Sequence, residues 1–370
     1  MSKLSETKQK NEKVKRRYFD YKRGPDGFSD KSILAVEKAI WKYEEFSKQE
    51  DFALFSNKKA EQFKKYLATK INKKSGKQLG LKSQYHHLRH LREFFLWLST
   101  QPGYKSRIGV TEAMYLQLSK KERQMATAPS EPKYPTLAQI QKMCSFPINN
   151  EIDQRDRALI AFTAITGIRD QAVVTLRIGC YDPDTRLIKQ LPSMGVETKF
   201  SKEIYTTLLS IDTELYRYFS EWYEYLTKEK RFGLEDPLFP STEIAQVGPK
   251  YHAYESKGVS KKFWADAGPM RQIFRDRAEE TNVDYFYPHS FRHFVTMEAE
   301  KYITTAEQMK ALSQNLGHEH VATTYRTYGG MSTRRVNEIV RSIDFSENKT
   351  PGRNDQIKLV ETLLKQLKQS

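Results

Sequence analysis

The N-terminal part of the chain carries apolar side chains at steps of three and four residues. One series is Ile33, Val36, Ile40, Tyr43 and Phe46, and a second is Leu88, Leu91, Phe95 and Leu98. That spacing puts apolar groups on one helical face, so each series predicts an amphipathic helix, with Ser83 as the N-cap of the second. A further helix is expected around residues 60–67. Residues 28–118 are therefore predicted to form a small helical bundle.

The pattern changes after this bundle. Residues 119–135, SKKERQMATAPSEPKYP, are polar, contain three prolines and break the helical period, which predicts an interdomain linker. Thr136 then fits the N-cap of the first helix of a larger domain. Within that domain, residues 155–165 predict an apolar helix ended by a Thr-Gly pair, and residues 169–177 predict another.

Short β-compatible runs follow these helices. They are residues 187–192, 195–200 and 203–209. Because proline, glycine and polar residues separate them, they predict a small antiparallel sheet. Helices are expected again at about residues 212–229 and from Pro269 onward. The predicted fold class is mainly α with a small antiparallel β-sheet (α+β), and the larger domain is expected to span residues 136–345.

Charge adds a partner to this picture. The 370 residues include 62 Lys and Arg against 46 Asp and Glu, a formal net charge of +16. Residues 57–92 alone hold eleven Lys or Arg and one acid. This concentration in one predicted bundle favours phosphate binding over a merely solvated cationic face, so nucleic acid is the first partner expected. His86, His87 and His90 lie within it and are read as surface or DNA-contacting residues, with metal binding as the alternative.

Several classes of protein are excluded. No run of about 18 apolar residues exists, and the basic N-terminus lacks the apolar stretch of a secretory signal. The two cysteines, Cys144 and Cys180, cannot build a disulfide framework and fit a reducing cytosol. Nucleotide-binding signatures such as G-x-x-x-x-G-K-[ST] and G-x-G-x-x-G after a strand are absent. An enzyme with this sequence is expected to work without ATP or a dinucleotide.

Three short strings of the larger domain carry candidate chemistry. They are TGIRDQAVVTLR with Arg169, PHSFRH with His289 and Arg292, and LGHEHVATTYRTYGG with His318 and Tyr328. In this order and spacing the strings resemble the boxes of the tyrosine recombinases, or phage-type integrases. The resemblance covers about residues 136–345. The basic helical domain ahead of it resembles the DNA-clamping, core-binding domain of that family.

The chemistry of such a site follows from its task. Cutting and rejoining a DNA phosphodiester without ATP requires the bond energy to be stored in a covalent protein–DNA link, and a tyrosine phenol can form one. Two arginines can hold the nonbridging oxygens through bidentate hydrogen bonds, and a lysine can protonate the leaving 5′-oxygen. None of these steps needs a metal ion. The expectation is therefore a site with no metal and no cofactor.

The resemblance assigns these roles to particular residues. Arg169, in the opening turn of its helix, and Arg292 are the clamping arginines; taken alone, Arg169 is equally well read as a surface arginine that caps the helix. Lys199 is the general acid, with Lys202 as its rival. His289 and His318 assist. A zinc site built from His289, His293, His318 and His320 is the structural alternative.

The nucleophile and one supporting residue depart from the common family pattern. Many members place the tyrosine nine residues after the histidine equivalent to His318, where this chain has Thr327. Tyr328, ten residues after it, matches a branch with a longer connection and is preferred over Tyr325. Ala172 stands where the family commonly has a glutamate, so support for the first arginine must come from another residue.

The chain ends complete the prediction. Residues 1–27 are expected to be a basic N-terminal arm, either frayed or contacting DNA, and residues 346–370 a tail with a docking helix. The apolar stripe of that helix is Ile357, Val360, Leu363, Leu364 and Leu367. By resemblance, it docks on a neighbouring protomer, so that dimers and tetramers assemble on double-stranded DNA with inverted half-sites.

The predicted function is a site-specific DNA recombinase or integrase in the bacterial cytoplasm, at the nucleoid. A type IB topoisomerase uses a similar set of side chains on one duplex and is the nearest alternative. The other is a DNA-binding regulator that kept the fold and lost catalysis.

Overall fold

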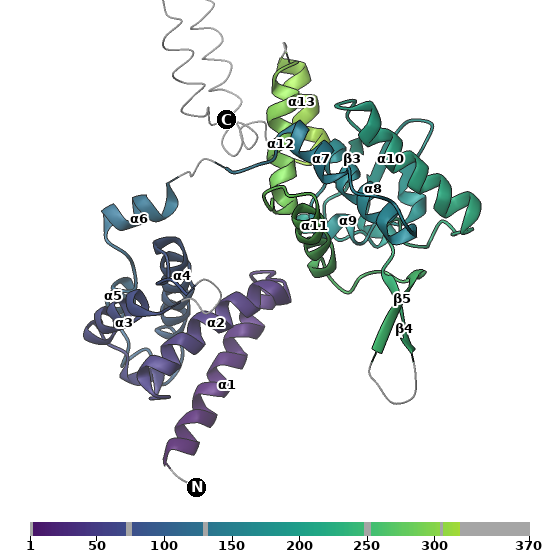
Figure 1. The fold of residues 1–370 in the computed structure, drawn as a ribbon. Helices are drawn as coiled ribbons and strands as arrows, with labels where there is room; N and C mark the ends of the chain where they lie inside the picture. The colour runs from purple at the N-terminus through teal and green to yellow at the C-terminus, as the bar shows by residue number, and fades with distance from the viewer. Residues whose placement is uncertain (1–2, 72–75, 129–131, 248–252, 304–305, 319–370) are drawn as a thin grey trace, which may run out of the picture. The chain divides into compact units, whose positions relative to one another are not determined.

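The protein is described here by a computed structural model, which defines residues 3–71, 76–128, 132–247, 253–303 and 306–318. The chain divides into two compact units, Met1–Ser130 and Glu131–Ser370. Figure 1 shows both, and each is described by itself. The predicted class, mainly α with small antiparallel sheets, is confirmed.

Unit 1 is a helical bundle built around aromatic side chains. Its helices are α1 Lys3–Arg23, α2 Asp30–Ser47, α3 Asn57–Thr69, α4 Leu81–Leu98, α5 Val110–Met114 and α6 Lys120–Thr127, with a 3-10 turn at Phe52–Leu54. Phe52, Phe63 and Phe95 are fully buried between these helices. Phe55 stacks on Phe95 with ring centroids 3.8 Å apart. The apolar series predicted from the sequence therefore face one core.

Helix α1 corrects the prediction of an N-terminal arm. Val14 and Tyr18 of α1 lie in the same core as α2 and α4. Lys15 is buried and donates to Glu44 of α2 over 2.8 Å, an ion pair that holds the two helices together. The region is basic as predicted, but α1 is packed into the bundle and is neither frayed nor a free arm.

The predicted linker is also corrected. Lys120–Thr127 forms α6, because Ser119 and Glu122 make a reciprocal capping box that satisfies backbone donors of the first turn. The prolines that predicted a linker lie beyond α6, and the boundary between the units falls at Ser130. At α4, the N-cap is Gly80 and not Ser83.

Unit 2 is organised around one buried helix, α8 Glu151–Thr166, capped by Asn150. The helices of the unit are α7 Leu137–Met143, α8, α9 Asp170–Val173, α10 Thr213–Glu224, α11 Gly268–Glu280, α12 Pro288–Glu300 and α13 Ala306–Asn315. Thr136 is the N-cap of α7 as predicted. Phe162 of α8 packs against Phe219 of α10, with ring centroids 4.8 Å apart. The core of the unit surrounds α8 and fixes the position of its C-terminal end.

A three-stranded antiparallel sheet lies beside these helices, in the order β1 (Tyr181–Asp182), β2 (Leu187–Gln190), β3 (Ile204–Thr207). The strand predicted at residues 195–200 is wrong. The chain there ends in a 3-10 turn at Lys199–Ser201, and Phe200 and Ser201 have φ angles of 62° and 51°, which a strand does not allow.

Two further details of unit 2 differ from the prediction. The helix expected at residues 169–177 is limited to the four residues of α9, and Arg177 instead forms an isolated bridge with Pro237. A second hairpin, β4 (Thr242–Val247) with β5 (Ala253–Val259), was not predicted.

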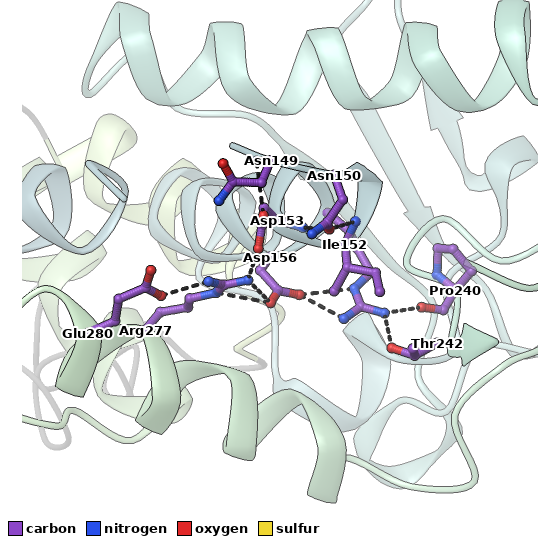
Figure 2. Close-up of polar contacts among 10 residues, drawn as sticks. Asn149, Asn150, Ile152, Asp153, Asp156, Pro240, Thr242, Arg277 and Glu280 are labelled. Atoms are coloured by element: carbon purple, nitrogen blue, oxygen red, sulfur yellow. Dashed lines mark hydrogen bonds and ion pairs between the residues drawn. The ribbon is translucent and has the colours of Figure 1, made fainter. Parts of the chain in front are cut away.

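Buried ion pairs fasten α8, α11 and the start of β4 to one another (Figure 2). The guanidinium of Arg277, on α11, contacts Asp153 at 2.5 Å and Asp156 at 2.9 Å, both on α8. Arg155, also on α8, donates to the Pro240 carbonyl over 3.1 Å and pairs with Asp156. Through these contacts the first half of α8 holds α11 and the base of the β4–β5 hairpin.

Among the described residues, no helix combines the length and the apolar composition that crossing a bilayer requires.

Candidate functional site

The site starts at the turn that ends α8. Gly167 is the C-cap with φ 62°, and its N–H donates to the Thr163 carbonyl over 3.0 Å. A Cβ at this position would lie 3.1 Å from a methyl carbon of Leu316, so both the left-handed conformation and the close packing favour glycine. The Thr-Gly pair in the sequence therefore turns the chain sharply and delivers Arg169 two residues later.

Arg292 joins three segments at this turn. It lies on α12, is 3% exposed, and donates from Nη1 to the Gly167 carbonyl over 3.0 Å. Its Nη2 donates to the Leu316 carbonyl and lies 2.8 Å from Nε2 of His318. Arg292 and His318, both predicted as site residues, are thus in direct contact.

His318 is held in its neutral form. Arginine can only donate hydrogen bonds, so Nε2 of His318 accepts and the ring proton resides on Nδ1. Burial, together with the positive charges of Arg292 and Arg169, lowers the pKa of His318 to about 4. At neutral pH the imidazole therefore carries no charge.

Arg169 stands at the N-cap position of α9, and its charge acts on the same histidines. Positive charge on Arg169 helps to lower the pKa of both His289 and His318. Among the described residues, none hydrogen-bonds or ion-pairs with its guanidinium. Arg169 therefore precedes a helix of only four residues, which is shorter than the helix expected at residues 169–177.

His289 and Lys199 occupy the outer side of this cluster. His289 lies in the first turn of α12, and its side chain reaches the surface. Protein atoms around the ring, then Arg292 and Arg169, lower its pKa, and Lys199 acts in the same direction. Lys199 is exposed on its 3-10 turn, where its Nζ lies 4.9 Å from the centroid of the Phe200 ring.

The rival lysine lies elsewhere on the same segment. Lys202 lines a groove between β3 and the end of α13, which His318 also borders. The positive charge of Lys199 lowers the pKa of His289. The choice of Lys199 over Lys202 stays a prediction.

A salt bridge that sequence reasoning missed lies beside Arg169. Asp170 accepts from Nε and Nη2 of Arg271, at 2.8 and 2.5 Å, through one carboxylate oxygen. The two residues are 101 positions apart, so no local sequence signal connects them. Ala172 stands at the position where the resemblance would place a glutamate. Its side chain is a buried methyl group and can form no hydrogen bond to Arg169.

The metal alternatives find no support in the described part of the chain. There, no group of three or more His, Cys, Asp or Glu side chains converges as metal ligands do. This applies to His86, His87 and His90 on α4, and to His289, His293 and His318 in unit 2. His289 and His293 contact edge to face, with ring centroids 6.0 Å apart.

Four predictions fall outside the residues that the structure describes. They concern the nucleophile Tyr328, its rival Tyr325, His320 of the zinc alternative, and the docking helix within residues 346–370.

The neutral state of His318 predicts that unit 2 loses stability in acid. The unfolded chain binds a proton at this side chain near pH 6.5, whereas the folded chain does so only near pH 4. The contribution of His318 to the free energy of unfolding is therefore complete above about pH 6.5. It is lost as the pH drops from there to about 4. Urea unfolding midpoints at several pH values measure this loss. A His318→Gln variant, whose amide oxygen can still accept from Arg292, should show a shallower decline, and an equally steep one would contradict the prediction.

Comparison with known proteins is consistent with this geometry. No curated protein matches the sequence of the chain. Among solved structures, the chain is similar to the Tn1549 transposon integrase in complex with a circular intermediate DNA, at 15% identity, 89% coverage of this chain, 99% of that one, and a TM-score of 0.52.

Two further structures have the same fold. One is the XerH site-specific recombinase bound to a palindromic difH substrate, at 13% identity, 84% and 79% coverage of the two chains, and a TM-score of 0.57. The other is a lambda integrase dimer bound to a COC′ core site, at 14% identity, 87% and 78% coverage, and a TM-score of 0.57. The profile of the phage integrase family matches residues 133–334, more than half of the chain. The chain therefore belongs to the phage integrase family, the tyrosine recombinases, which are DNA strand-transferring enzymes.

Proposed function

We propose that this recombinase cuts and rejoins DNA at specific sites through a covalent 3′-phosphotyrosyl intermediate, without a metal ion or ATP. The observation that carries the proposal is the convergence of Arg292 and His318 in direct contact, with the charge of Arg169 acting on the same histidine. This arrangement presents hydrogen-bond donors and positive charge to one anion.

In the proposed first step, the phenolic oxygen of Tyr328 attacks the scissile phosphorus and loses its proton. The bond from phosphorus to the 5′-oxygen breaks, and the DNA 3′-phosphate stays on the tyrosine. A 5′-hydroxyl from a second strand then attacks this phosphodiester and releases the phenol. The number of phosphoester bonds is unchanged, which explains why the cycle needs no ATP.

The arginines and His318 stabilise the negative charge that builds on the nonbridging oxygens. Arg292 is already oriented by two carbonyls, so little reorganisation is needed when the phosphate binds. Arg169 has a guanidinium free of described protein partners and can bind an oxygen through two N–H groups. His318 contacts Arg292 and adds no charge of its own.

Proton transfer is assigned to the outer side of the site. Lys199 protonates the leaving 5′-oxygen, and its exposed position on a turn lets it approach the DNA. His289 has a lowered pKa and is neutral at pH 7, so it can accept the phenolic proton.

Unit 1 is proposed to hold the duplex. An open groove beside α3, α5 and α6 is lined by four cationic side chains, Lys64, Lys65, Lys120 and Arg123, against the carboxylates Glu61 and Glu122. Such a lining favours the DNA backbone, which carries one phosphate charge at each nucleotide. The full proposal includes double-stranded DNA with inverted half-sites, dimers and tetramers joined through the C-terminal helix, and action at the bacterial nucleoid.

A nicked suicide duplex tests the reaction. With DNA taken from the ends of the element that encodes it, the wild-type protein should form a covalent adduct on a 3′-phosphate, resistant to SDS and formed in excess EDTA. Joined products from two duplexes indicate recombination. Relaxation of a supercoiled plasmid without such joining would favour the topoisomerase alternative, and DNA binding without any adduct would favour the inactive regulator.

A further inference from the structure

A cluster of three side chains lies immediately beside the proposed phosphate site. Asp170 is the first residue of α9 and follows Arg169 directly. Nε and Nη2 of Arg271 donate to Oδ2 of Asp170 over 2.8 and 2.5 Å. Oδ1 accepts from the backbone N–H of Gln171 over 2.9 Å. Both carboxylate oxygens are therefore fixed, and with them the start of α9.

The same guanidinium reaches the segment before α12. The Arg271 guanidinium lies 5.1 Å from the centroid of the Tyr287 ring, in a cation–π contact. Tyr287 is the N-cap residue of α12, and its carbonyl accepts from the backbone N–H and the hydroxyl of Ser290, each at 2.7 Å. Arg271 thus connects the turn that carries Arg169 with the helix that carries His289 and Arg292.

The cluster also controls charge at the site. The cations Arg292, Arg169 and Lys199 disfavour protonation of His289, and the carboxylate of Asp170 favours it. An unpaired carboxylate at this position would repel a phosphate. Two N–H groups of Arg271 donate to the carboxylate of Asp170, so a positive charge lies next to this carboxylate and compensates it.

We infer that Arg271 is a positioning residue for strand cleavage: with Asp170 and Tyr287 it orients Arg169 and compensates the Asp170 carboxylate beside the proposed phosphate site. The inference rests on the proposed function and assigns to this pair the support that Ala172 cannot give. The ion pair is partly buried at the edge of the site, so its effect is expected in the reaction as well as in local structure. The side chain of Arg271 is 39% exposed and that of Asp170 15% exposed.

The chain offers a matched control on the same helix. Arg275 lies one turn further along α11 and stacks on Tyr285 at 4.7 Å, as Arg271 stacks on Tyr287. It donates to Gln272 and not to Asp170. Arg275→Gln therefore removes an arginine–tyrosine contact and a positive charge of α11 without touching the cluster.

The experiment compares single-turnover adduct formation on the nicked suicide duplex. Arg271→Gln is expected to slow cleavage by about 10- to 100-fold, because small displacements of a clamping group have effects of this size. Arg271→Lys should recover only part of the rate, since a lysine keeps the charge but not the planar fork. Arg275→Gln should cleave close to the wild-type rate, with all variants assayed well below their thermal midpoints.

The pH–rate profile separates positioning and charge from a purely structural role. In Arg271→Gln the carboxylate of Asp170 is uncompensated and faces His289 together with Arg169, Arg292, Lys199 and the neighbouring His293. The acid limb of the profile should then move to higher pH, and Asp170→Asn combined with Arg271→Gln should return it towards its wild-type position. An unshifted profile, or equal rates for Arg271→Gln and Arg275→Gln, would overturn the inference. Absence of an adduct with the wild-type protein would instead overturn the proposed function.

Discussion

A Tyr328→Phe variant is expected to bind its DNA with unchanged affinity and to form no detectable covalent adduct. Phenylalanine lacks only the phenolic oxygen, so it removes the nucleophile and leaves the size of the side chain nearly unchanged. The arginines and histidines of the phosphate site stay in place, because Arg292 is held by the carbonyls of Gly167 and Leu316. SDS-resistant complexes and a gel-shift titration on the same duplex measure the two properties separately.

Tyr325→Phe is the matched control for this experiment. The substitution is chemically identical and lies three residues away in the same sequence string. It should retain adduct formation. The reverse result, with Tyr325→Phe inactive and Tyr328→Phe active, would transfer the nucleophile to Tyr325 and keep the rest of the mechanism. Adduct formation by both variants would contradict a nucleophile in this string.

Replacing Arg277 by leucine is expected to destabilise unit 2 by about 3–5 kcal/mol, the range typical when one partner of a buried ion pair is removed. The side chains of Arg277, Asp153 and Asp156 are only 13%, 10% and 6% exposed. Burial already raises the pKa of Asp156 against the effect of two arginines. Without Arg277, Asp156 keeps only Arg155 as a cationic partner among the described residues, and Asp153 loses the ion pair that joins it to α11 (Figure 2).

Arg217→Leu provides the comparison for Arg277→Leu. Arg217 also pairs with two carboxylates, Glu214 and Glu221 on α10, but its side chain is 48% exposed. Such an exposed network contributes about 0–1 kcal/mol. Urea unfolding followed by a probe in unit 2 should show a large shift of the midpoint for Arg277→Leu and a small one for Arg217→Leu. Equal midpoints would contradict the importance assigned to the buried network.

Helices with a clear apolar period could be predicted from the sequence. The contact between the string that contains Arg169 and the string that contains Arg292 could be predicted as well. In α8, a continuous apolar run ends at a Thr-Gly pair, and glycine is the residue that a left-handed cap favours. Arg169 follows that cap at a fixed distance. The resemblance of the three strings to the recombinase boxes then implied one site for Arg169, Arg292 and His318, and the structure places Arg292 against both Gly167 and His318.

Other features depend on contacts that no local pattern encodes. The pairing of Asp170 with Arg271 links residues 101 positions apart. The burial of Lys15 against Glu44 could not be seen in a sequence that looked like a basic arm. The capping box of Ser119 and Glu122 was readable, but the nearby prolines outweighed it. Residues 195–200 alternate as a strand does, yet the positive φ of Phe200 ends the extended conformation.

The contacts of Arg292 also link the assembly of the candidate site to the folding of unit 2. The guanidinium reaches its orientation only after the end of α8, α12 and the segment after α13 have come together on it. A nascent or partly unfolded chain lacks at least one of these carbonyls. In such a chain the guanidinium of Arg292 is not held in its final orientation. The candidate site is therefore complete only when the tertiary folding of unit 2 is complete.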